Sequence, residues 1–292
     1  MYRNKLFTYR RREALTGYTY AALPILGFAA FYVIPFGITI MKTFSGGMTG
    51  FNYVGLDNYK SVLNSEAFHL AAGNTLKFIG VGVPMLLVIS LAVALLLNTR
   101  LRGADAFRAA YVLPLVLPTA SVILVFQILF ETGGVINYAL TKLGLEPVSF
   151  LHSGNAFWVL LLLYLWKNIG YGIILMLADL TQIPKEYYEA AHVDGAGSLI
   201  CLYRITLPMM VPTFLFVTVI SIVGAFKSFR EAFALGGAYP DDSIYMLQHF
   251  MNNNFAQLNY ARLSVAAVLI FLVIFAFVMV LFSRRGKGGI GE

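Results

Sequence analysis

The sequence contains a single cysteine, Cys201, and four histidines among its 292 residues. One cysteine excludes an internal disulfide, and it excludes the zinc sites that are built from several cysteines. No two histidines have the His-x-x-x-His spacing of a helical metal pair. We therefore expect no bound metal in this chain and interpret the histidines as unrelated polar loop residues.

Charged residues are also scarce. They make up 12% of the chain, whereas hydrophobic residues make up 59%; an average soluble domain has roughly a quarter charged residues. So few charges cannot cover the surface of a soluble protein of this length. The composition therefore predicts an integral membrane protein.

Six apolar runs are each close to the roughly 20 residues that cross a hydrocarbon core as a helix. The second and sixth are the clearest, because almost no polar residue interrupts them. The fifth is weaker, because Lys227, Arg230 and Glu231 lie in its last third. We predict an all-α membrane protein with about six transmembrane helices. The predicted spans are residues 17–40, 76–97, 109–130, 157–178, 212–235 and 263–282.

The first run could be mistaken for a secretory signal, because arginines at residues 10–12 precede it as in a basic n-region. The apolar part of a signal has about 7 to 15 residues, whereas this run exceeds 20 residues and contains Pro24 and Pro35. We therefore predict an uncleaved first helix.

Lysine and arginine in the short loops predict the orientation, because cytoplasmic segments carry an excess of them. With the N-terminus inside, the outer loops proper hold only Lys42, Lys60 and Lys142, and the inner segments hold most of the other basic residues. Both termini are therefore expected in the cytoplasm. The net charge of +7 mostly reflects this bias, so the sequence does not indicate a nucleic-acid partner.

No segment between the spans is long enough for a soluble domain. We predict one membrane domain over residues 17–283, preceded by a cytoplasmic segment, 1–16, and followed by a cytoplasmic tail, 284–292. The tail contains a G-x-G-x-x-G spacing, but no strand-to-helix turn surrounds it, as a dinucleotide site would require. The chain also lacks a G-x-x-x-x-G-K-[ST] phosphate loop, so any ATP that drives it must bind another subunit.

The inner loop between the fourth and fifth predicted spans has the composition of two short helices. Pro184 stands where a helix begins, residues 185–193 are good or neutral helix formers, and Gly195 and Gly197 allow a break. Such a helix pair could dock in a groove of a partner protein. Alternatively, it is an amphipathic linker on lipid headgroups, and the local chemistry alone favours this alternative slightly.

The same loop carries a spaced motif. Glu189-Ala190-Ala191 is followed after three residues by Gly195, and after nine more by Ile205 and Leu207-Pro208. This pattern resembles the EAA-loop signature of ABC importer permeases, which lies in a cytoplasmic loop before the penultimate span. In that family the loop is a coupling helix held in a cleft of the ATPase subunit. The resemblance assigns ATPase coupling to Glu189, Ala190, Ala191, Asp194, Gly195, Ile205, Leu207 and Pro208.

Further stretches are similar to the carbohydrate, or maltose-type, branch of that family. They are residues 54–59, 74–75, 101–103, 113–118 and 166–170. The resemblance covers nearly the whole chain and is strongest to the first of the two permeases in such heterodimers. One departure is Leu235–Pro240, which stands where the family often has Thr-Gly-Gly-Gly-Pro. That departure leaves the substrate subtype open.

The fourth predicted span carries a polar face. Tyr164, Lys167, Asn168 and Tyr171 recur at steps of three and four residues, so they share one side of a helix. A lysine at membrane depth is costly to expose to lipid, which indicates that this face meets protein or water. The four residues are candidates for a substrate path, unless Lys167 snorkels to the interface or bonds a neighbouring helix.

A second polar cluster, Lys227, Arg230 and Glu231, lies near the outer end of the fifth predicted span. Glu231 follows Lys227 by four residues, so the two could pair on a helix, a contact worth about 0.2–0.5 kcal/mol when exposed. Alternatively, the cluster forms an outer gate or contacts anionic groups of a substrate. Gln127 and Glu131 are further candidates at the outer end of the third span.

The resemblance implies the permease subunit of an ABC importer, which takes up a sugar or oligosaccharide by alternating access and is not itself an enzyme. Its relatives work with a second permease, two ATPase subunits and an extracytoplasmic solute-binding protein in the bacterial or archaeal plasma membrane. ATP and Mg belong to the ATPase subunits, and no cofactor is expected in this chain.

Two alternatives belong to other classes. The first is an ABC permease for another nutrient, such as a peptide or phosphate, against which the carbohydrate-like stretches argue. The second is a secondary transporter or membrane receptor that needs no ATPase. The sequence has no conspicuous inverted repeat, which argues against a secondary transporter.

The charge bias predicts that both termini are cytoplasmic. Single cysteines placed near Asn4 and at Gly291 should react with an impermeant maleimide only after the membrane is permeabilised. A cysteine at Lys60, in a predicted outer loop, serves as the positive control in intact cells. Labelling of either terminus in intact cells would contradict the orientation.

Overall fold

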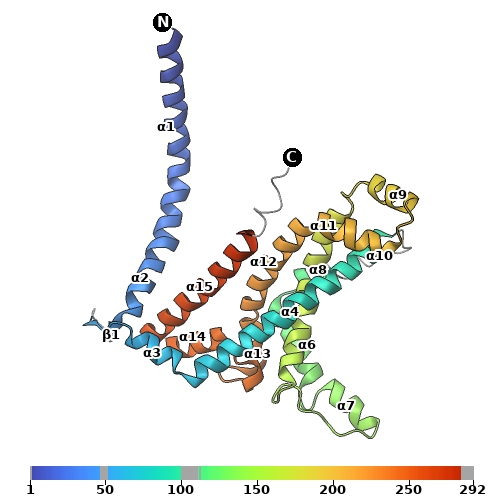
Figure 1. Cartoon of the computed structure of the whole chain (residues 1–292). Coiled ribbons are helices and arrows are strands. Elements are labelled where there is room, and N and C mark those ends of the chain that lie inside the picture. The colour runs from blue at the N-terminus through green and yellow to red at the C-terminus, as the bar shows by residue number, and fades with distance from the viewer. Residues whose placement is uncertain (1, 47–51, 100–110, 112, 284–292) are drawn as a thin grey trace. The chain divides into compact units, whose positions relative to one another are not determined.

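A computed structural model describes residues 2–46, 52–99, 111 and 113–283 of the chain, and these residues are mostly helical (Figure 1). Six helical stretches in this part are long and apolar enough to cross a membrane, which confirms the predicted fold class. They are Thr16–Thr43, Glu66–Asn98, Thr119–Lys142, Ala156–Leu180, Val211–Gly236 and Tyr260–Val280.

Two of the predicted span boundaries differ from the structure. The helix of the second span begins at Glu66 instead of residue 76, because the amphipathic residues before the apolar run continue the same helix. In the third span, α6 (Thr119–Phe130) starts only after Pro118, and a turn at residues 131–134 separates it from α7 (Val135–Lys142). Residues 113–116 of the predicted span are helical, and residues 109, 110 and 112 lie outside the described residues, as do the motif 101–103 and the tail 284–292.

The chain divides into two compact units, and the first contains residues 1–64 and 254–274. Its two short strands pair in antiparallel orientation, with Ser45 opposite Tyr53 and Gly46 opposite Asn52. Its elements are α1 (Tyr2–Phe28), η1 (Ala29–Val33), α2 (Ile34–Thr43), β1 (Ser45–Gly46), β2 (Asn52–Tyr53), α3 (Asp57–Leu63) and part of α15 (Tyr260–Ser283).

Both π-helical turns in the described part of the chain stand just before a proline. In η1 the N–H of Ile34 bonds to the carbonyl of Ala29, and in η2 (Leu202–Thr206) the N–H of Leu207 bonds to the carbonyl of Leu202. Pro35 and Pro208 follow directly. Proline has no N–H and its ring clashes with the preceding turn, so a widened i→i−5 turn accommodates it without ending the helix.

The second unit, residues 65–253 and 275–292, contains the helices of the second to fifth spans. Their order alternates long spans with short connecting helices. The elements are α4 (Glu66–Asn98), α6, α7, α8 (Ala156–Leu180), α9 (Lys185–Val193), α10 (Ser198–Cys201), η2, α11 (Leu207–Met209), α12 (Val211–Lys227), α13 (Phe229–Gly236), η3 (Asp242–Ile244) and α14 (Leu247–Ala256).

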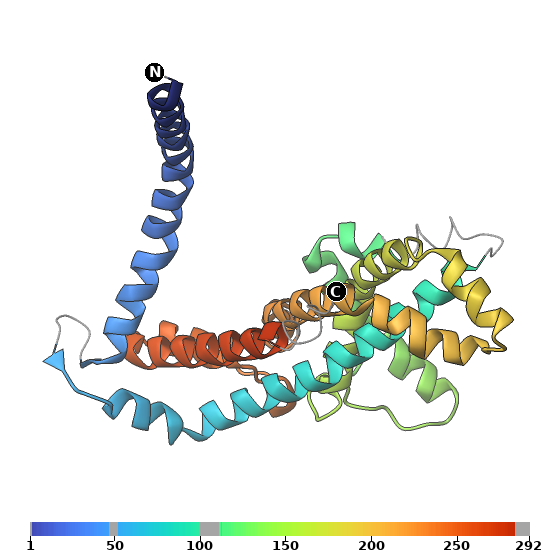
Figure 2. The same cartoon turned by 45° about the horizontal axis from the view of Figure 1, so that its top comes forward.

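Helices α4, α8 and α12 pack against one another, and α8 is the most buried of the three (Figure 1). Phe78 of α4 makes edge contacts with Phe157 and Tyr164 of α8, with ring centroids 6.1 and 5.3 Å apart. Helix association in a bilayer depends on such close packing, since lipid tails are as apolar as the side chains. Two views show α9 and α10 at one end of α8, and α7 and α13 at the other (Figures 1 and 2).

Glycine allows the close approach of α4 and α8. A Cβ at Gly172 would lie 2.4 Å from Oγ of Ser90 and 3.3 Å from Cδ2 of Leu86. We therefore predict that Gly172→Ala forces the two helices apart and lowers the free energy of unfolding by about 1–3 kcal/mol, as overpacking does. Thermal unfolding of the purified chain in detergent measures this loss.

The matched control is Gly80→Ala in α4, where an added Cβ would meet no atom within 4 Å. This substitution should leave stability unchanged or raise it by about 0.5–1 kcal/mol, because alanine restricts the unfolded chain and favours the helix. Equal unfolding temperatures for the two variants would show that the α4–α8 contact does not require a glycine.

Candidate functional site

The inner loop, residues 181–210, folds as the predicted pair of short helices. Pro184 is the N-cap of α9 and fixes the backbone that leads into the helix. Helix α10 begins after Gly197 and continues through η2 and α11 toward α12. The loop therefore forms an ordered helical element at the end of α8.

A Schellman motif ends α9 and requires a glycine. The N–H of Ala196 donates to the carbonyl of Ala191 at 2.8 Å, and the N–H of Gly195 donates to the carbonyl of His192 at 3.0 Å. Gly195 has φ +80°, in the left-handed region that costs other residues strain. Gly197 has φ −77° and needs no glycine on conformational grounds. The predicted break thus depends on Gly195 alone.

Buried contacts hold this helix pair on the second unit. The hydroxyls of Tyr188 and Thr206 form a hydrogen bond of 2.9 Å between α9 and η2, and Thr206 is buried. Ile205 packs against the hydrophobic core. A cavity of about 440 Å³ lies beneath the pair and is bordered by the ends of α4 and α8. The bond between Tyr188 and Thr206 and the packing of Ile205 therefore brace the inner loop from its inward side.

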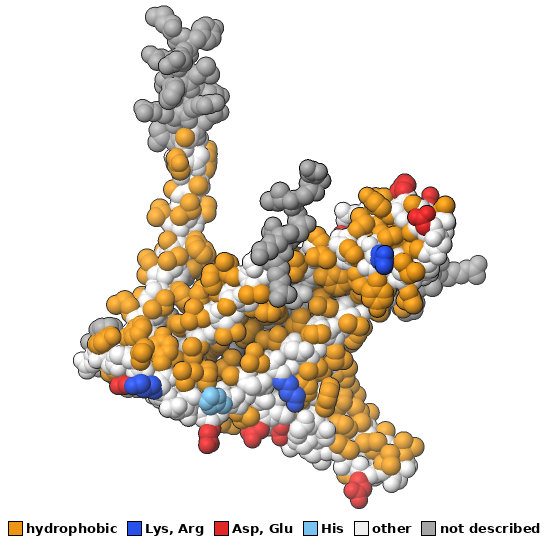
Figure 3. Space-filling view, in the orientation of Figure 1, with side chains coloured by type: hydrophobic (Ala, Val, Ile, Leu, Met, Phe, Trp, Pro, Cys, Tyr) orange, Lys and Arg blue, Asp and Glu red, His pale blue; other side chains and the backbone are white. Residues whose placement is uncertain are grey.

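The outward side of α9 presents most of the predicted coupling residues. Glu189, Ala190 and Asp194 are exposed, and Ala191 is half-buried. At the far end of the motif Leu207 is half-buried and Pro208 exposed. Hydrophobic side chains cover much of the second unit in Figure 3, and acidic side chains on this face gather over α9 and at the opposite end of the unit. The inner loop thus presents small and acidic side chains outward together with large exposed ones such as Val193 and Tyr203.

An intramembrane cluster joins three helices at the middle of α8. Nζ of Lys167 donates to Oε1 of Glu231 in α13 at 2.5 Å and to Oγ1 of Thr119 at the start of α6 at 2.7 Å. The side chains of Lys167 and Glu231 are 21% and 7% exposed. Thr119, Lys167 and Glu231 are called the intramembrane cluster below. Lys167 therefore bonds neighbouring helices, which was one of the two predicted alternatives.

Two expectations about these polar residues are corrected by the structure. Tyr164 does not border an open path in this chain: it is 1% exposed, and its hydroxyl donates to the carbonyl of Ser221 at 2.8 Å. Glu231 does not pair with Lys227 within the described residues, because the helix breaks at Ser228 and turns the carboxylate toward Lys167. Both residues thus connect helices.

The other predicted path residues remain at or near the surface. Asn168 is half-buried and donates to the carbonyl of Tyr164 at 2.8 Å. Tyr171 is exposed, one turn further along α8. Lys227 and Arg230, on either side of the break at Ser228, are also exposed. Polar groups at this depth require protein or water as neighbours.

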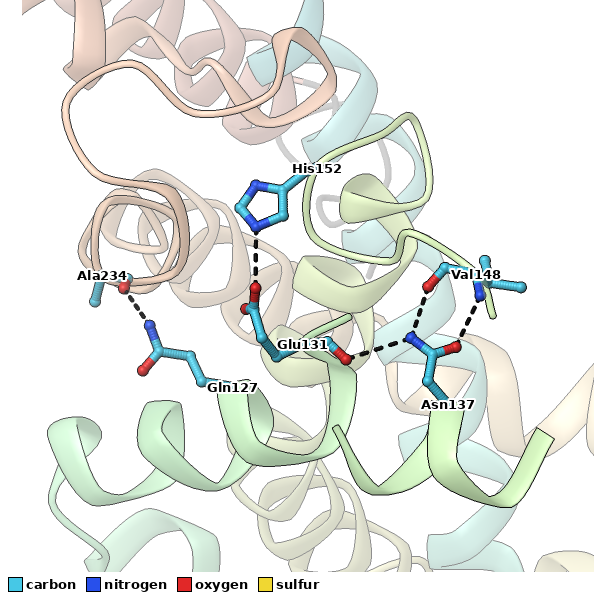
Figure 4. Close-up of polar contacts among 6 residues, drawn as sticks. All are labelled: Gln127, Glu131, Asn137, Val148, His152 and Ala234. Atoms are coloured by element: carbon cyan, nitrogen blue, oxygen red, sulfur yellow. Dashed lines mark hydrogen bonds and ion pairs between the residues drawn. The ribbon is translucent and has the colours of Figure 1, made fainter. Parts of the chain in front are cut away.

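Polar contacts organise the outer end of α6 (Figure 4). Nε2 of Gln127 donates to the carbonyl of Ala234 in α13 at 2.9 Å, and His152 lies 3.2 Å from the carboxylate of Glu131. Asn137, which is buried in α7, donates to the carbonyls of Glu131 and Val148 and accepts from the N–H of Val148. Gln127 thus connects α6 to α13, whereas Glu131 and Asn137 shape the outer loop.

An aromatic contact holds the other side of α13. His249 of α14 is fully buried, and its ring lies 4.7 Å from that of Phe229. Burial lowers the pKa of His249 to about 4, so the ring is neutral at ordinary pH and packs as an aromatic side chain. Its Nδ1 accepts the N–H of Met246 at 3.0 Å.

Some of these contacts could not be found in the sequence. Thr119, Thr206 and Asn137 have no distinctive local pattern, and their importance arises only from partners on other elements. Asn74 and Thr75 form one of the stretches that are similar to the carbohydrate branch, and both bond to the segment before α14. Nδ2 of Asn74 donates to the carbonyl of Tyr245, and Oγ1 of Thr75 accepts from the N–H of Leu247. Within the described residues no acidic, histidine and cysteine side chains gather as metal ligands would.

Comparison with known proteins connects these features. Residues 78–286, which include the inner loop and the intramembrane cluster, match the family described as "Binding-protein-dependent transport system inner membrane component". The arabinooligosaccharides transport system permease protein AraP of Bacillus subtilis (strain 168) is 32% identical over 224 residues, covering 75% of this chain and 71% of AraP. The trehalose/maltose transport system permease protein MalF of Thermococcus litoralis is 28% identical over 275 residues, covering 92% of this chain and 93% of MalF.

A solved structure shares the fold. One chain of a bacterial ABC transporter involved in the import of the acidic polysaccharide alginate matches with a TM-score of 0.81 and 23% sequence identity. The match covers 98% of this chain and 99% of that chain. At this level of identity the likeness establishes the common architecture and leaves the substrate open.

Proposed function

The chain belongs to the family of binding-protein-dependent transport system inner membrane components, and on that premise we propose that it imports a sugar or oligosaccharide by alternating access. It is a multi-pass membrane permease of an ABC importer and not itself an enzyme. The single observation that carries the mechanism is the braced inner loop, with its motif from Glu189 to Pro208 presented at one end of α8.

The substrate class is supported by the relatives. AraP and MalF are named for transport of arabinooligosaccharides and of trehalose and maltose, and both are similar over most of this chain. We propose a related substrate, delivered by an extracytoplasmic solute-binding protein. The departure at Leu235–Pro240 is compatible with a sugar that differs from maltose.

The energy source is proposed to be a pair of ATPase subunits that bind ATP and Mg. A second permease subunit would complete the translocation path, and both termini of this chain would lie in the cytoplasm. In this arrangement the chain performs no bond chemistry. It converts ATP-dependent movement at the inner loop into a change in the side of the membrane from which the substrate site is accessible.

The path is proposed to run along the exposed and half-buried polar positions of α8 and α12–α13. Asn168 and Tyr171 lie beside Lys167, and Lys227 and Arg230 lie nearer the outer end. Sugars are bound by aromatic faces together with groups that hydrogen-bond hydroxyls, and these residues offer both.

We predict that Tyr171→Ala and Asn168→Ala reduce sugar uptake by about tenfold or more, equivalent to roughly 1.4 kcal/mol of lost transition-state stabilisation. Assembly of the complex should be normal, since Tyr171 is exposed. Uptake into vesicles and yield of purified complex are measured together. Trp158→Ala, which removes another exposed ring from α8, is the matched control and should retain uptake. Loss of uptake only in proportion to lost complex would make the two residues structural.

The inner loop is predicted to couple ATP hydrolysis to transport. Gly195→Val places a β-branched residue at φ +80°, at a cost of about 1–2 kcal/mol that the turn relieves by changing shape. Glu189→Lys reverses an exposed charge on α9. Both variants should weaken ATPase attachment or uncouple hydrolysis from uptake, while the sugar affinity of the solute-binding protein stays the same.

The measurement is substrate-stimulated ATP hydrolysis beside uptake in reconstituted vesicles. Gly197→Val is the matched control, because Gly197 has an ordinary φ of −77° and an added Cβ meets no atom within 4 Å. Normal hydrolysis and normal uptake in the Gly195→Val and Glu189→Lys variants would refute the assignment of this loop as the coupling element.

A further inference from the structure

Glu231 lies on a short helical segment that is separated from α12 by one residue. Helix α12 ends at Lys227 and α13 begins at Phe229, so that Ser228 is the only residue between them. Ser228 has φ −66° and ψ −5°. An α-helix has ψ near −42°, so a rotation of about 40° at this residue would join the two segments into one helix.

The break at Ser228 decides which lysine Glu231 can reach. In this structure the carboxylate is buried and meets Lys167 at 2.5 Å, whereas Lys227 is exposed. On a continuous helix, residues four apart are neighbours on one face, and Lys227 would then lie beside Glu231. The two pairings exclude each other, because each needs a different backbone at Ser228.

Each lysine keeps a polar neighbour or contact with solvent when it loses Glu231. Lys167 also donates to Oγ1 of Thr119 at 2.7 Å, which would remain when the carboxylate leaves. Lys227 is already exposed in this structure without an ion pair among the described residues. Lys167 is 21% exposed, so its ammonium keeps a hydroxyl partner and partial access to solvent after the exchange, whereas a fully buried charge with no polar neighbour would be the most costly outcome in a bilayer.

Glu231 itself is only half satisfied in the present pairing. Its Oε2 atom is buried and has no hydrogen-bond partner, although a permanent buried carboxylate normally uses both oxygens. At the other end of α13, Gly237 has φ +73° and ends the segment with a backbone that other residues avoid. Helix α13 thus begins after a break whose backbone angles are close to helical and ends at a glycine turn.

We propose that Glu231 is a switch residue that exchanges Lys167 for Lys227 when α12 and α13 change from a broken to a continuous helix. The broken helix, which is the arrangement in this structure, keeps α13 against α6 and α8 through Lys167 and Gln127. The continuous helix releases both contacts and moves α13 away from them. This inference rests on the proposed function in one respect, that the exchange accompanies alternating access.

Distances between spin labels can detect the exchange. Labels at Ile174 of α8 and Ala234 of α13, both exposed positions, are introduced as cysteines into the purified complex carrying Cys201→Ser. Lys167→Met should deplete the separation that matches this structure and enrich a second one. Lys227→Met should have the opposite effect and remove the second label-to-label separation. Both variants are measured with and without an ATP analogue.

A charge exchange provides the sharper test and guards against a variant that does not fold. Lys167→Glu combined with Glu231→Lys restores the pair between α8 and α13, but it places two lysines four residues apart on a continuous helix. The double variant should therefore show only the separation of the broken helix. A purely structural salt bridge predicts instead that the double variant behaves like the parent.

Lys142→Met is the matched control, since it removes an exposed cation of α7 that lies over the ring of Tyr138, on the same helix. It should leave the distances unchanged. The proposal is overturned if Lys167→Met and Lys227→Met shift the distances in the same direction or not at all. The measurement needs no substrate, so a failure of sugar uptake alone would revise the proposed function and leave the switch standing.

Discussion

A charged group within the hydrocarbon must find its partner inside the protein, and this constraint arranges the middle of the second unit. Lys167 donates hydrogen bonds to Glu231 and Thr119, and these bonds hold α13 and α6 against α8. Removing one partner of a buried pair costs about 3–5 kcal/mol, because the other charge is left uncompensated. The cluster therefore stabilises the arrangement of these helices mainly because other arrangements would leave a buried charge unpaired, and less through the net attraction of the pair. An alternative is permitted only where a second partner can be reached, as we propose for Lys227 and Glu231.

Helix α8 connects this cluster to the inner loop. Its close contact with α4 depends on Gly172, and its contact with α12 depends on the bond from Tyr164 to the carbonyl of Ser221. At its end the pairing of Tyr188 with Thr206 holds the inner loop in shape. Tightly packed elements shift as rigid bodies between discrete arrangements. Under the proposed function, movement imposed on α9 would be transmitted along α8 and α12 to the residues around Glu231.

The large exposed hydrophobic surface follows from the same environment. Trp158, Leu162 and Trp166 are all exposed along α8, a pattern that would mark an interaction site on a soluble protein. On a membrane permease such side chains face lipid or another subunit. The polar exceptions, Asn168, Tyr171, Lys227 and Arg230, carry more information, because lipid cannot solvate them.

The sequence by itself determined the fold class, the number of spans and the helix pair of the inner loop. These features depend on apolar runs, proline and glycine, whose effects act within a few turns of chain. It also determined the family, through residues such as Glu189, Gly195 and Pro208 whose spacing is local. The boundaries of the second and third spans were less well determined, because amphipathic residues can extend a helix beyond its apolar run.

Only the tertiary structure decided the partners of Tyr164 and Glu231. Local spacing indicated that Glu231 could pair with Lys227, and on an unbroken helix it would. The actual partner depends on a backbone angle at Ser228 and on how α8 is rotated against α13. Neither quantity is encoded in a short stretch of sequence, because packing between segments far apart in the chain sets both.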